Sequence, residues 1–144
     1  MYMRIAIVGY GNLGQGAELA LRDCRDCEAV GVFTRRDPAA IRTRTGIPVC
    51  PAADILSWEG KLDVLLLCGG SAADLPEVTP ALAAHFEVVD SFDNHRDIPA
   101  HFARTDAAAR AGGHLALIAA GWDPGLFSLL RLYADAVLPD GQTY

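Results

Sequence analysis

The sequence predicts an α/β fold with a doubly wound, mostly parallel sheet, formed as a single domain over residues 1–144. Near the N-terminus, an apolar run at residues 5–8 leads directly into the turn Gly9-Tyr10-Gly11-Asn12-Leu13-Gly14, and an Ala- and Leu-rich helical stretch follows. Apolar runs and helical patterns then alternate along the chain, which indicates parallel strands joined by right-handed crossovers. The length suffices for one hydrophobic core. Together these observations predict a Rossmann fold.

Six short apolar runs are expected to form strands, at residues 5–8, 29–33, 48–49, 64–67, 88–89 and 115–119. Helical patterns separate them and are expected at residues 13–23, 38–45, 52–57, 75–84, 98–111 and 124–137. In an open parallel sheet, ligands bind outside the carboxyl ends of the strands. The residues that follow each strand are therefore the candidates for function.

The first of these segments has the G-x-G-x-x-G spacing of a dinucleotide-binding turn. We expect Gly9 to permit the tight turn, Gly11 to let backbone N–H groups approach a pyrophosphate, and Gly14 to let the helix lie close to the sheet. Asn12 and Leu13 open the helix, whose first N–H groups have no partner within the helix and attract phosphate. The alternative is a tight turn that binds no nucleotide.

The end of the second strand indicates which dinucleotide binds. A carboxylate there would bind the adenosine ribose hydroxyls, whereas guanidinium groups attract a 2′-phosphate. This chain has Thr34-Arg35-Arg36 and no acidic residue before Asp37. The residues therefore favour NADP(H) over NAD(H), unless the two arginines are only solvated loop charges.

The segment after the fourth strand consists of Cys68, Gly69, Gly70 and Ser71. Small residues at this place let the backbone pass close to a cofactor, so all four are candidates for cofactor contact. Ser71 or Asp74 could cap the helix that follows. For Asp74, capping alone is a sufficient explanation.

Two further loops hold polar residues that the cofactor motif does not explain. The fifth strand is followed by a loop containing Asp93 and Asp97, and the sixth by Trp122 and Asp123. We expect Asp97 to cap a helix, and Asp93 to have a function because Trp122-Asp123 would emerge at the same edge of the sheet. Asp123 could itself be a helix cap, with Pro124 at the first helical position.

Composition excludes several classes of function. The chain has 12 basic and 18 acidic residues, a net charge of −6, so it lacks the broad basic surface of a nucleic-acid-binding protein. Lys61 is the single lysine, which argues strongly against a catalytic lysine. No apolar stretch approaches 18 residues and no signal peptide is apparent, so a cytoplasmic location is expected. Hydrophobic residues make up 51% of the chain, so some apolar surface is expected to meet another chain or domain.

The cysteines do not form a convincing metal site. Cys24 and Cys27 have C-x-x-C spacing, but Cys50 and Cys68 stand apart at the ends of apolar runs, and no histidine is near in sequence. Structural or incidental thiols are therefore expected, with no bound metal.

Taken together, these segments resemble the meso-diaminopimelate dehydrogenases, NADP-dependent D-amino-acid dehydrogenases of bacterial lysine biosynthesis. The segments that carry the resemblance are I-A-I-V-G-Y-G-N-L-G (5–14), F-T-R-R (33–36), L-C-G-G-S-A-A-D-L-P (67–76), F-D-N-H-R-D-I-P (92–99) and G-W-D-P-G (121–125). The glycine turn is shared with many families, whereas the last two segments are much more specific. The resemblance extends over essentially the whole chain.

The resemblance implies oxidative deamination at the D-centre of meso-2,6-diaminopimelate, giving L-2-amino-6-oxopimelate, NADPH and ammonia. Carried over by position, Asp93 and Asp123 would hold the D-centre ammonium group and could accept its proton, while Trp122 would pack on the substrate. Members of this family continue into a substrate and dimerisation domain that has no counterpart here. We therefore expect an oligomer in which a second polypeptide carries that domain; a truncated chain is the alternative.

Two other functions remain open at this point. An NADP(H)-sensing module without enzymatic activity would have no need for Asp93, Trp122 and Asp123 to converge. The cofactor domain of an imine or dihydrodipicolinate reductase would differ from the leading hypothesis in its substrate domain.

Overall fold

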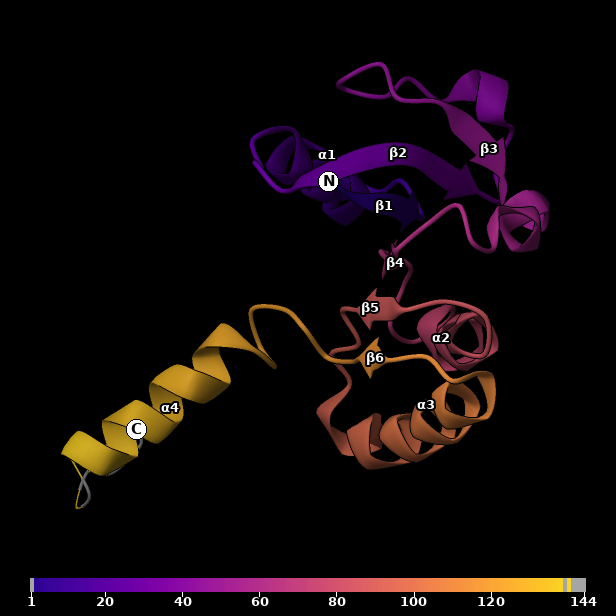
Figure 1. Cartoon of the computed structure of the whole chain (residues 1–144). Helices are drawn as coiled ribbons and strands as arrows, with labels where there is room; N and C mark the ends of the chain where they lie inside the picture. Colours follow the sequence, from indigo (N-terminus) through magenta and orange to yellow (C-terminus); the bar gives the residue numbers. More distant parts are fainter. Residues whose placement is uncertain (1, 139, 141–144) are drawn as a thin grey trace.

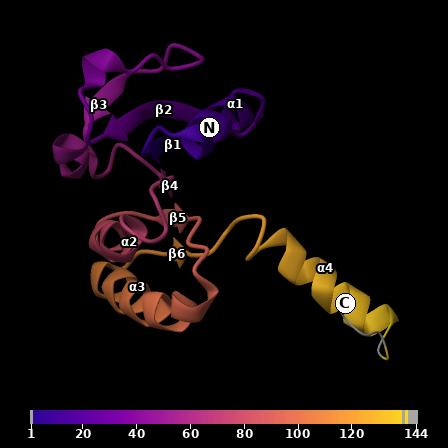
Figure 2. The same ribbon diagram turned by 180° about the vertical axis from the view of Figure 1, so that it is seen from behind.

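A computed structural model describes residues 2–138 and 140 of the chain. Its six parallel strands form one sheet in the order β3-β2-β1-β4-β5-β6 (Figures 1 and 2). The strands are β1 Met3–Val8, β2 Cys27–Thr34, β3 Val49–Pro51, β4 Val64–Leu67, β5 Val88–Asp90 and β6 Ala116–Leu117. The helices are α1 Asn12–Arg22, α2 Leu75–Ala83, α3 Ile98–Gly112 and α4 Leu126–Val137, and 3-10 turns form at Pro38–Ala40, Ala52–Trp58 and His95–Asp97. The predicted doubly wound Rossmann fold is confirmed.

The sheet is buried on both faces, as its apolar strands require. Three consecutive residues of β1, at positions 5–7, are all buried, which is typical of a parallel strand covered on both sides. On one face, α1 packs over a small core around Ile7, Val32 and Ile41. On the other face, a larger core around Leu65, Leu75 and their neighbours includes residues of α2 and α3.

The order of the strands reverses between β1 and β4: β2 and β3 lie on one side of β1, and β4, β5 and β6 lie on the other. Strand β1 pairs with β2 on one side, where Val8 is opposite Phe33, and with β4 on the other, where Val8 is opposite Leu67. The loops after β1, β2 and β4 therefore leave the sheet side by side at its carboxyl edge. This is the place where open α/β sheets bind their ligands.

Five of the six expected helices form within two residues of their expected bounds, the one at 52–57 as the 3-10 turn Ala52–Trp58, but the expected helix at 38–45 is wrong in extent. Of that range, only Pro38–Ala40 forms a 3-10 turn. The buried carboxylate of Glu18 on α1 accepts hydrogen bonds from the backbone N–H groups of Arg44, at 3.0 Å, and Thr45, at 2.6 Å. Because these amides bond to a side chain, they are not available to a helix. Glu18 thus ties the 41–47 loop to α1.

Two C-terminal elements are also shorter than expected. Strand β6 covers Ala116–Leu117 instead of 115–119, because Ala119 leaves the extended conformation with φ 55°. Helix α4 begins at Leu126 instead of Pro124, and its N-cap is Gly125, whose N–H donates to Ser128 Oγ at 3.3 Å. Asp123 is therefore not a helix cap, which corrects one of its two expected roles.

An ion pair links the start of β1 to the residue before β4. The Arg4 backbone N–H and guanidinium donate to both carboxylate oxygens of Asp63 at 2.6 to 3.1 Å. These bonds, those of the side chain first, lower the pKa of Asp63 to about 2 from an ordinary value of 3.8.

Because the pKa of Asp63 is lower in the folded chain, the ionised carboxylate stabilises the fold above its ordinary pKa, and this stabilisation is lost as the pH falls through about 2. We expect Asp63→Asn to lower the thermal midpoint near neutral pH, and the gap from the parent to close as the pH is taken down toward 2. Thermal melts over this pH range measure the gap. Asp54→Asn, at an exposed carboxylate with no arginine partner among the described residues, is the control; a gap for Asp63→Asn that is the same at every pH would contradict the argument.

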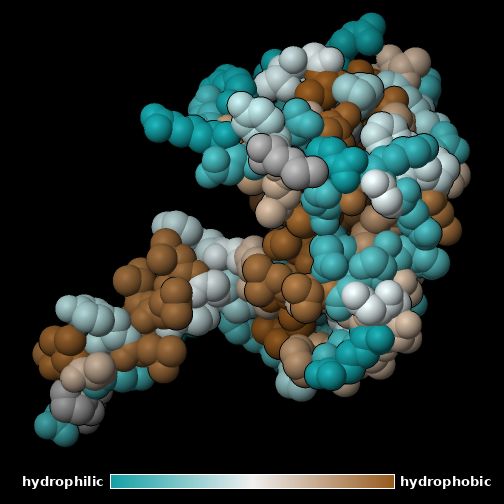
Figure 3. All heavy atoms as spheres, in the orientation of Figure 1, coloured by the Kyte–Doolittle hydropathy of each residue, from teal (hydrophilic) through white to brown (hydrophobic). Residues whose placement is uncertain are grey.

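Helix α4 projects away from the rest of the molecule (Figures 1 and 2), and none of its described residues is buried. Its surface is largely apolar in the space-filling view (Figure 3). Exposed large apolar side chains lie along it, at Leu126, Phe127, Leu129, Leu130, Leu132, Tyr133 and Val137. A continuous apolar surface of this kind is typical of a face that meets another domain or chain. No helix in the described part of the chain is both long and apolar enough to span a membrane.

Candidate functional site

The glycine turn brings the start of α1 against the end of β1. Gly9 has φ 93°, which confirms the tight turn expected there, and its N–H donates to the Phe33 carbonyl oxygen at 2.9 Å. A Cβ added to Gly14 would lie 2.2 Å from the Gly9 carbonyl oxygen, so only glycine allows this close approach. Gly11 is the N-cap and makes no side-chain cap bond. The first N–H groups of α1 are thus left for an external acceptor.

The two arginines after β2 lie beside this turn. Arg36 donates from Nη2 to the Tyr10 carbonyl oxygen at 2.5 Å, and its backbone N–H donates to Thr34 Oγ1 at 3.1 Å. Arg35 donates to Asp74 Oδ1 at 2.6 Å and is largely exposed. Both guanidinium groups therefore lie at the carboxyl edge of the sheet, where a 2′-phosphate on an adenosine ribose would meet them.

An apolar cavity of about 260 Å³ opens between Arg35 and α2. Its walls come from the ends of β1, β2 and β4, from the turn after β3 and from α2, and they include Val8, Phe33, Ile55, Leu67, Leu75, Val78 and Leu82. Arg35 and Asp74 also line it. A mainly apolar slot with a few polar groups at one end suits a flat aromatic base.

The expected capping role of Asp74 is wrong in its chemistry. Asp74 occupies the N-cap position of α2, but its carboxylate makes no cap bond. It accepts instead from the Gly70 N–H, at 3.1 Å, and from Arg35, and these bonds, Gly70 first, lower the pKa of Asp74 despite an opposing effect of burial. Asp74 therefore links the loop after β4 to the loop after β2 across the cavity.

The other candidates in the loop after β4 divide into two kinds. Cys68 approaches the glycine turn, because a Cβ on Gly9 would lie 3.1 Å from its carbonyl oxygen, and burial raises the pKa of its thiol to about 11. Ser71 does not cap α2. Its hydroxyl lies 3.4 Å from the Ser91 carbonyl oxygen and 3.3 Å from the Asp93 nitrogen. Ser71 thus contacts the loop after β5, on the side of the site away from the arginines.

The two loops expected to carry the chemistry lie next to each other. His95, in the loop after β5, has its Nε2 3.7 Å from Asp123 Oδ1, in the loop after β6. Asp93 is exposed two residues before His95, and its backbone is held by Ser71. Trp122 is 64% exposed and packs its ring at 4.9 Å from that of Phe127. The structure therefore brings the segments of Asp93, Trp122 and Asp123 to one edge of the sheet.

Asp123 is already paired with a cation. Arg131, on α4, donates to both of its carboxylate oxygens, at 2.9 and 2.7 Å. The bonds from Arg131 come first among the causes that lower the pKa of Asp123, and the charges of Arg131 and His95 add to them. The carboxylate is therefore held ionised, which suits it to bind an ammonium group. Sequence analysis missed Arg131 and His95, although Arg131 lies only eight residues after Asp123.

The cap expected at Asp97 is also only partly correct. Asp97 is the N-cap residue of α3, but its side chain makes no cap bond. Its carboxylate accepts from Asn94 Nδ2 at 2.6 Å and from Arg96 Nε at 3.2 Å. These bonds fold the Asp-Asn-His-Arg-Asp loop on itself.

The residues that the structure describes contain no group of three or more His, Cys, Asp or Glu side chains placed to hold a metal ion. All four cysteines are free thiols. Backbone donation from Asp26, followed by a contact with Cys27, lowers the pKa of the exposed Cys24 thiol.

Comparison with known proteins identifies relatives of this chain. No family model matches the chain. A meso-diaminopimelate D-dehydrogenase of Ureibacillus thermosphaericus is 51% identical over 142 residues, which cover 99% of this chain and 44% of that protein. This chain is homologous to the N-terminal domain of the meso-diaminopimelate D-dehydrogenases. The expected relationship is confirmed, and the chain spans less than half the length of the curated relatives that it matches.

Two solved dehydrogenase structures agree with the fold. An engineered D-amino acid dehydrogenase bound to NADP+ superposes with a TM-score of 0.89 at 46% identity, covering 99% of this chain and 43% of that one. The Corynebacterium glutamicum diaminopimelate dehydrogenase in complex with diaminopimelate superposes with a TM-score of 0.87 at 46% identity, covering 97% and 42% of the two chains. The engineered D-amino acid dehydrogenase thus binds NADP+, the dinucleotide that the arginines after β2 favour.

Proposed function

We propose that this chain is the NADP(H)-binding part of a meso-diaminopimelate D-dehydrogenase and carries the residues that bind the reacting D-centre. In the proposed reaction, meso-2,6-diaminopimelate, NADP+ and water give L-2-amino-6-oxopimelate, NADPH, ammonium and one proton. The observation that carries the proposal is the adjacency of the Asp93 and Asp123 loops at the carboxyl edge, where His95 lies 3.7 Å from Asp123. This edge also holds the glycine turn, in a chain 51% identical to such an enzyme over 142 residues.

The described residues fit NADP(H). The uncapped start of α1 would bind the pyrophosphate, the apolar cavity would receive the adenine, and Arg35 and Arg36 would bind the 2′-phosphate. Gly9, Gly11, Asn12, Leu13, Gly14, Thr34, Cys68, Gly69, Gly70 and Ser71 are the proposed neighbours of the dinucleotide. When bound, NADP+ supplies a nicotinamide carbon that accepts hydride.

The protein's part in the reaction is to hold the amino acid and manage its charge. Asp93 and Asp123 would bind the D-centre ammonium group, and Trp122, exposed beside them, would pack on the substrate. The amine must lose a proton before its α-carbon can release hydride, so one of the two carboxylates must accept that proton. Because Arg131 binds both carboxylate oxygens of Asp123 and lowers its pKa, we assign Asp123 to binding the charge, which leaves Asp93 as the proposed proton acceptor.

We further propose that a second polypeptide supplies the rest of the substrate site. The curated relatives are more than twice as long as the region that this chain matches. The apolar side of α4 has no cover in the described structure and would pack against that polypeptide. The assembled enzyme would then be a hetero-oligomer, with Arg131 at the boundary between the two parts.

A domain exchange tests the proposed reaction. We expect that this chain, replacing the matching 142 residues of the Ureibacillus thermosphaericus enzyme, gives a chimera that reduces NADP+ with meso-diaminopimelate. Supplying the remaining part of that enzyme as a separate polypeptide tests the second proposal, with copurification and activity as readouts. A chimera that folds and binds NADPH but oxidises no diaminopimelate would exclude the enzymatic function and favour a sensing module. Activity only when the parts are fused would exclude assembly from two chains.

A further inference from the structure

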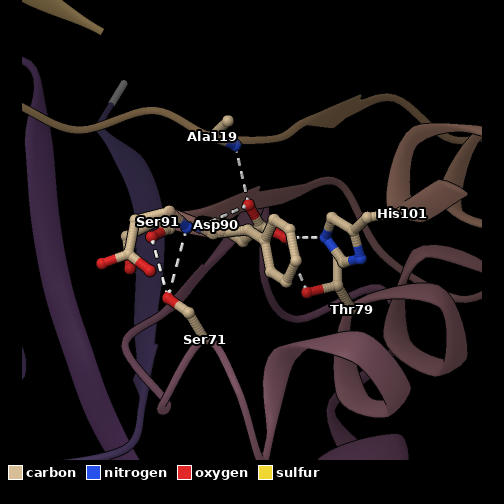
Figure 4. A network of polar contacts seen from close by, with 8 residues as sticks. Ser71, Thr79, Asp90, Ser91, His101 and Ala119 are labelled. Carbon is tan, nitrogen blue, oxygen red and sulfur yellow. Dashed lines mark hydrogen bonds and ion pairs between the residues drawn. The ribbon is translucent and has the colours of Figure 1, made fainter. Parts of the chain in front are cut away.

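Beneath the proposed substrate loops lies a buried pair of titratable groups that the proposed reaction does not use. Asp90, the last residue of β5, and His101, on α3, are each 1% exposed. Asp90 Oδ2 lies 2.6 Å from His101 Nε2 and accepts from Thr79 Oγ1 at 2.8 Å (Figure 4). Because the carboxylate can only accept, Nε2 is the protonated nitrogen of the imidazole.

The other oxygen of Asp90 binds the backbone of both loops. Asp90 Oδ1 accepts from the Phe92 N–H at 3.1 Å and from the Ala119 N–H at 2.8 Å. The Asp90 carbonyl oxygen also accepts from the Ala120 N–H at 2.9 Å. Phe92 directly precedes Asp93, and Ala120 lies three residues before Asp123. One residue therefore sets where both loops leave the sheet.

Two local features of this network lower the stability of the fold. The Nδ1 atom of His101 is buried without a hydrogen-bond partner among the described residues. Burying an unpaired polar atom costs free energy of folding, and an apolar side chain would avoid this cost. Ala119 has φ 55°, a left-handed conformation that residues with a Cβ seldom adopt, and its N–H is held in it by Asp90. Such costs at one place are typical of a segment that positions functional groups.

We infer that His101 is a positioning residue, which orients the Asp90 carboxylate so that its second oxygen holds the Asp93 and Asp123 loops at a defined separation. His101 and Thr79 bind Oδ2 from α3 and α2, and so leave Oδ1 directed at the two backbone N–H groups (Figure 4). Phe92 stacks on the imidazole at 4.2 Å between ring centroids and 21° between planes, so the loop also packs on the same side chain. The functional consequence rests on the proposed function; the coupling of the loops does not.

Two substitutions separate hydrogen bonding from packing. His101→Phe retains an aromatic ring for Phe92 to stack on but removes the donor to Asp90, whereas His101→Gln retains an N–H donor and removes the ring. In the full chain, we expect His101→Phe to speed hydrogen exchange about tenfold at the amides of Phe92, Ala119 and Ala120, with no change in the β1 amides. In His101→Gln, we expect the same three amides to exchange hydrogen nearly as slowly as in the parent.

The controls address general destabilisation. Phe86→Leu weakens the core that contains Phe92 but removes no hydrogen-bond donor to Asp90, so it should leave the three amides no more affected than the rest of the sheet. Thr79→Val removes the other donor to Oδ2 and replaces His101→Phe if that variant does not fold. Unchanged exchange at the three amides in the variant that folds, or equal changes in His101→Phe, His101→Gln and Phe86→Leu, would overturn the inference.

The chimera supplies the kinetic readout. Because a displacement of about 1 Å at a reacting group can cost up to a hundredfold in rate, we expect His101→Phe to lower kcat for diaminopimelate by at least about tenfold. NADPH affinity should be unchanged, and His101→Gln should restore most of the rate. A rate unaffected by His101→Phe would overturn the positioning role. If the parent chimera itself oxidises no diaminopimelate, the proposed function fails, and hydrogen exchange alone decides the coupling.

Discussion

Asp123→Asn is expected to reduce diaminopimelate oxidation by the chimera at least about tenfold, because the amide loses the charge that binds the ammonium group, and a hydrogen bond to a charged group contributes about 1.5–3 kcal/mol. The substitution retains the shape of the side chain, and Asp123 lies on the loop after β6, away from the glycine turn and the apolar cavity. NADPH binding, measured by fluorescence titration of the variant, should therefore stay close to that of the parent.

The matched control for this prediction is Asp23→Asn. Asp23 also accepts two bonds from an arginine, Arg22, at 2.8 and 3.0 Å, but it follows α1 at the opposite edge of the sheet. Both variants thus lose one bidentate ion pair, and only one of them lies in the proposed site. A chimera with Asp123→Asn that keeps the parental rate would remove Asp123 from the mechanism.

The second large effect concerns the choice of dinucleotide. We expect the double variant Arg35→Ala, Arg36→Ala to bind NADPH at least about a hundredfold more weakly, because each hydrogen bond to a charged group contributes about 1.5–3 kcal/mol. NADH lacks the 2′-phosphate, so its affinity should change little. Titration of the isolated chain with both dinucleotides measures the ratio of the two affinities.

Removal of two positive charges also changes the net charge of an already acidic chain, and the control must match that change. Arg22→Ala, Arg25→Ala removes the same charge from the opposite edge of the sheet, where both arginines are exposed. We expect this control to retain the parental preference for NADPH. Equal affinities for NADPH and NADH in the parent chain would contradict the role assigned to Arg35 and Arg36.

Local sequence patterns were sufficient for most of the fold. The strand before Gly9, the helix after it and the alternation that followed were readable because apolar spacing reflects burial on each element. The helix expected at 38–45 does not form in full, because Glu18 on α1, distant in sequence, binds the amides of residues 44 and 45. A side chain distant in sequence cannot be seen in a local pattern.

The site was predictable to a similar degree. The rule that ligands meet the carboxyl ends of parallel strands led to Arg36, Asp93 and Asp123 without a structure. The partners of these residues were not predictable, because Arg131 approaches Asp123 only through the turn at 121–125, and His101 reaches Asp90 only through the packing of α3. Sequence order thus indicated which residues meet at this edge of the sheet, and three-dimensional packing showed how they are held; their functions stay predictions.

The pairing of β1 has a consequence for folding during synthesis. Its two neighbours are β2, which ends at Thr34, and β4, which begins at Val64. One edge of β1 therefore stays unpaired until the ribosome has synthesised β4, which begins 56 residues after Val8. At about 5–20 residues per second, that edge stays open for roughly 3–11 s on the ribosome. During that interval its apolar residues are open to pairing with other chains. Long-range parallel pairing thus leaves the early chain open to aggregation until β4 has emerged.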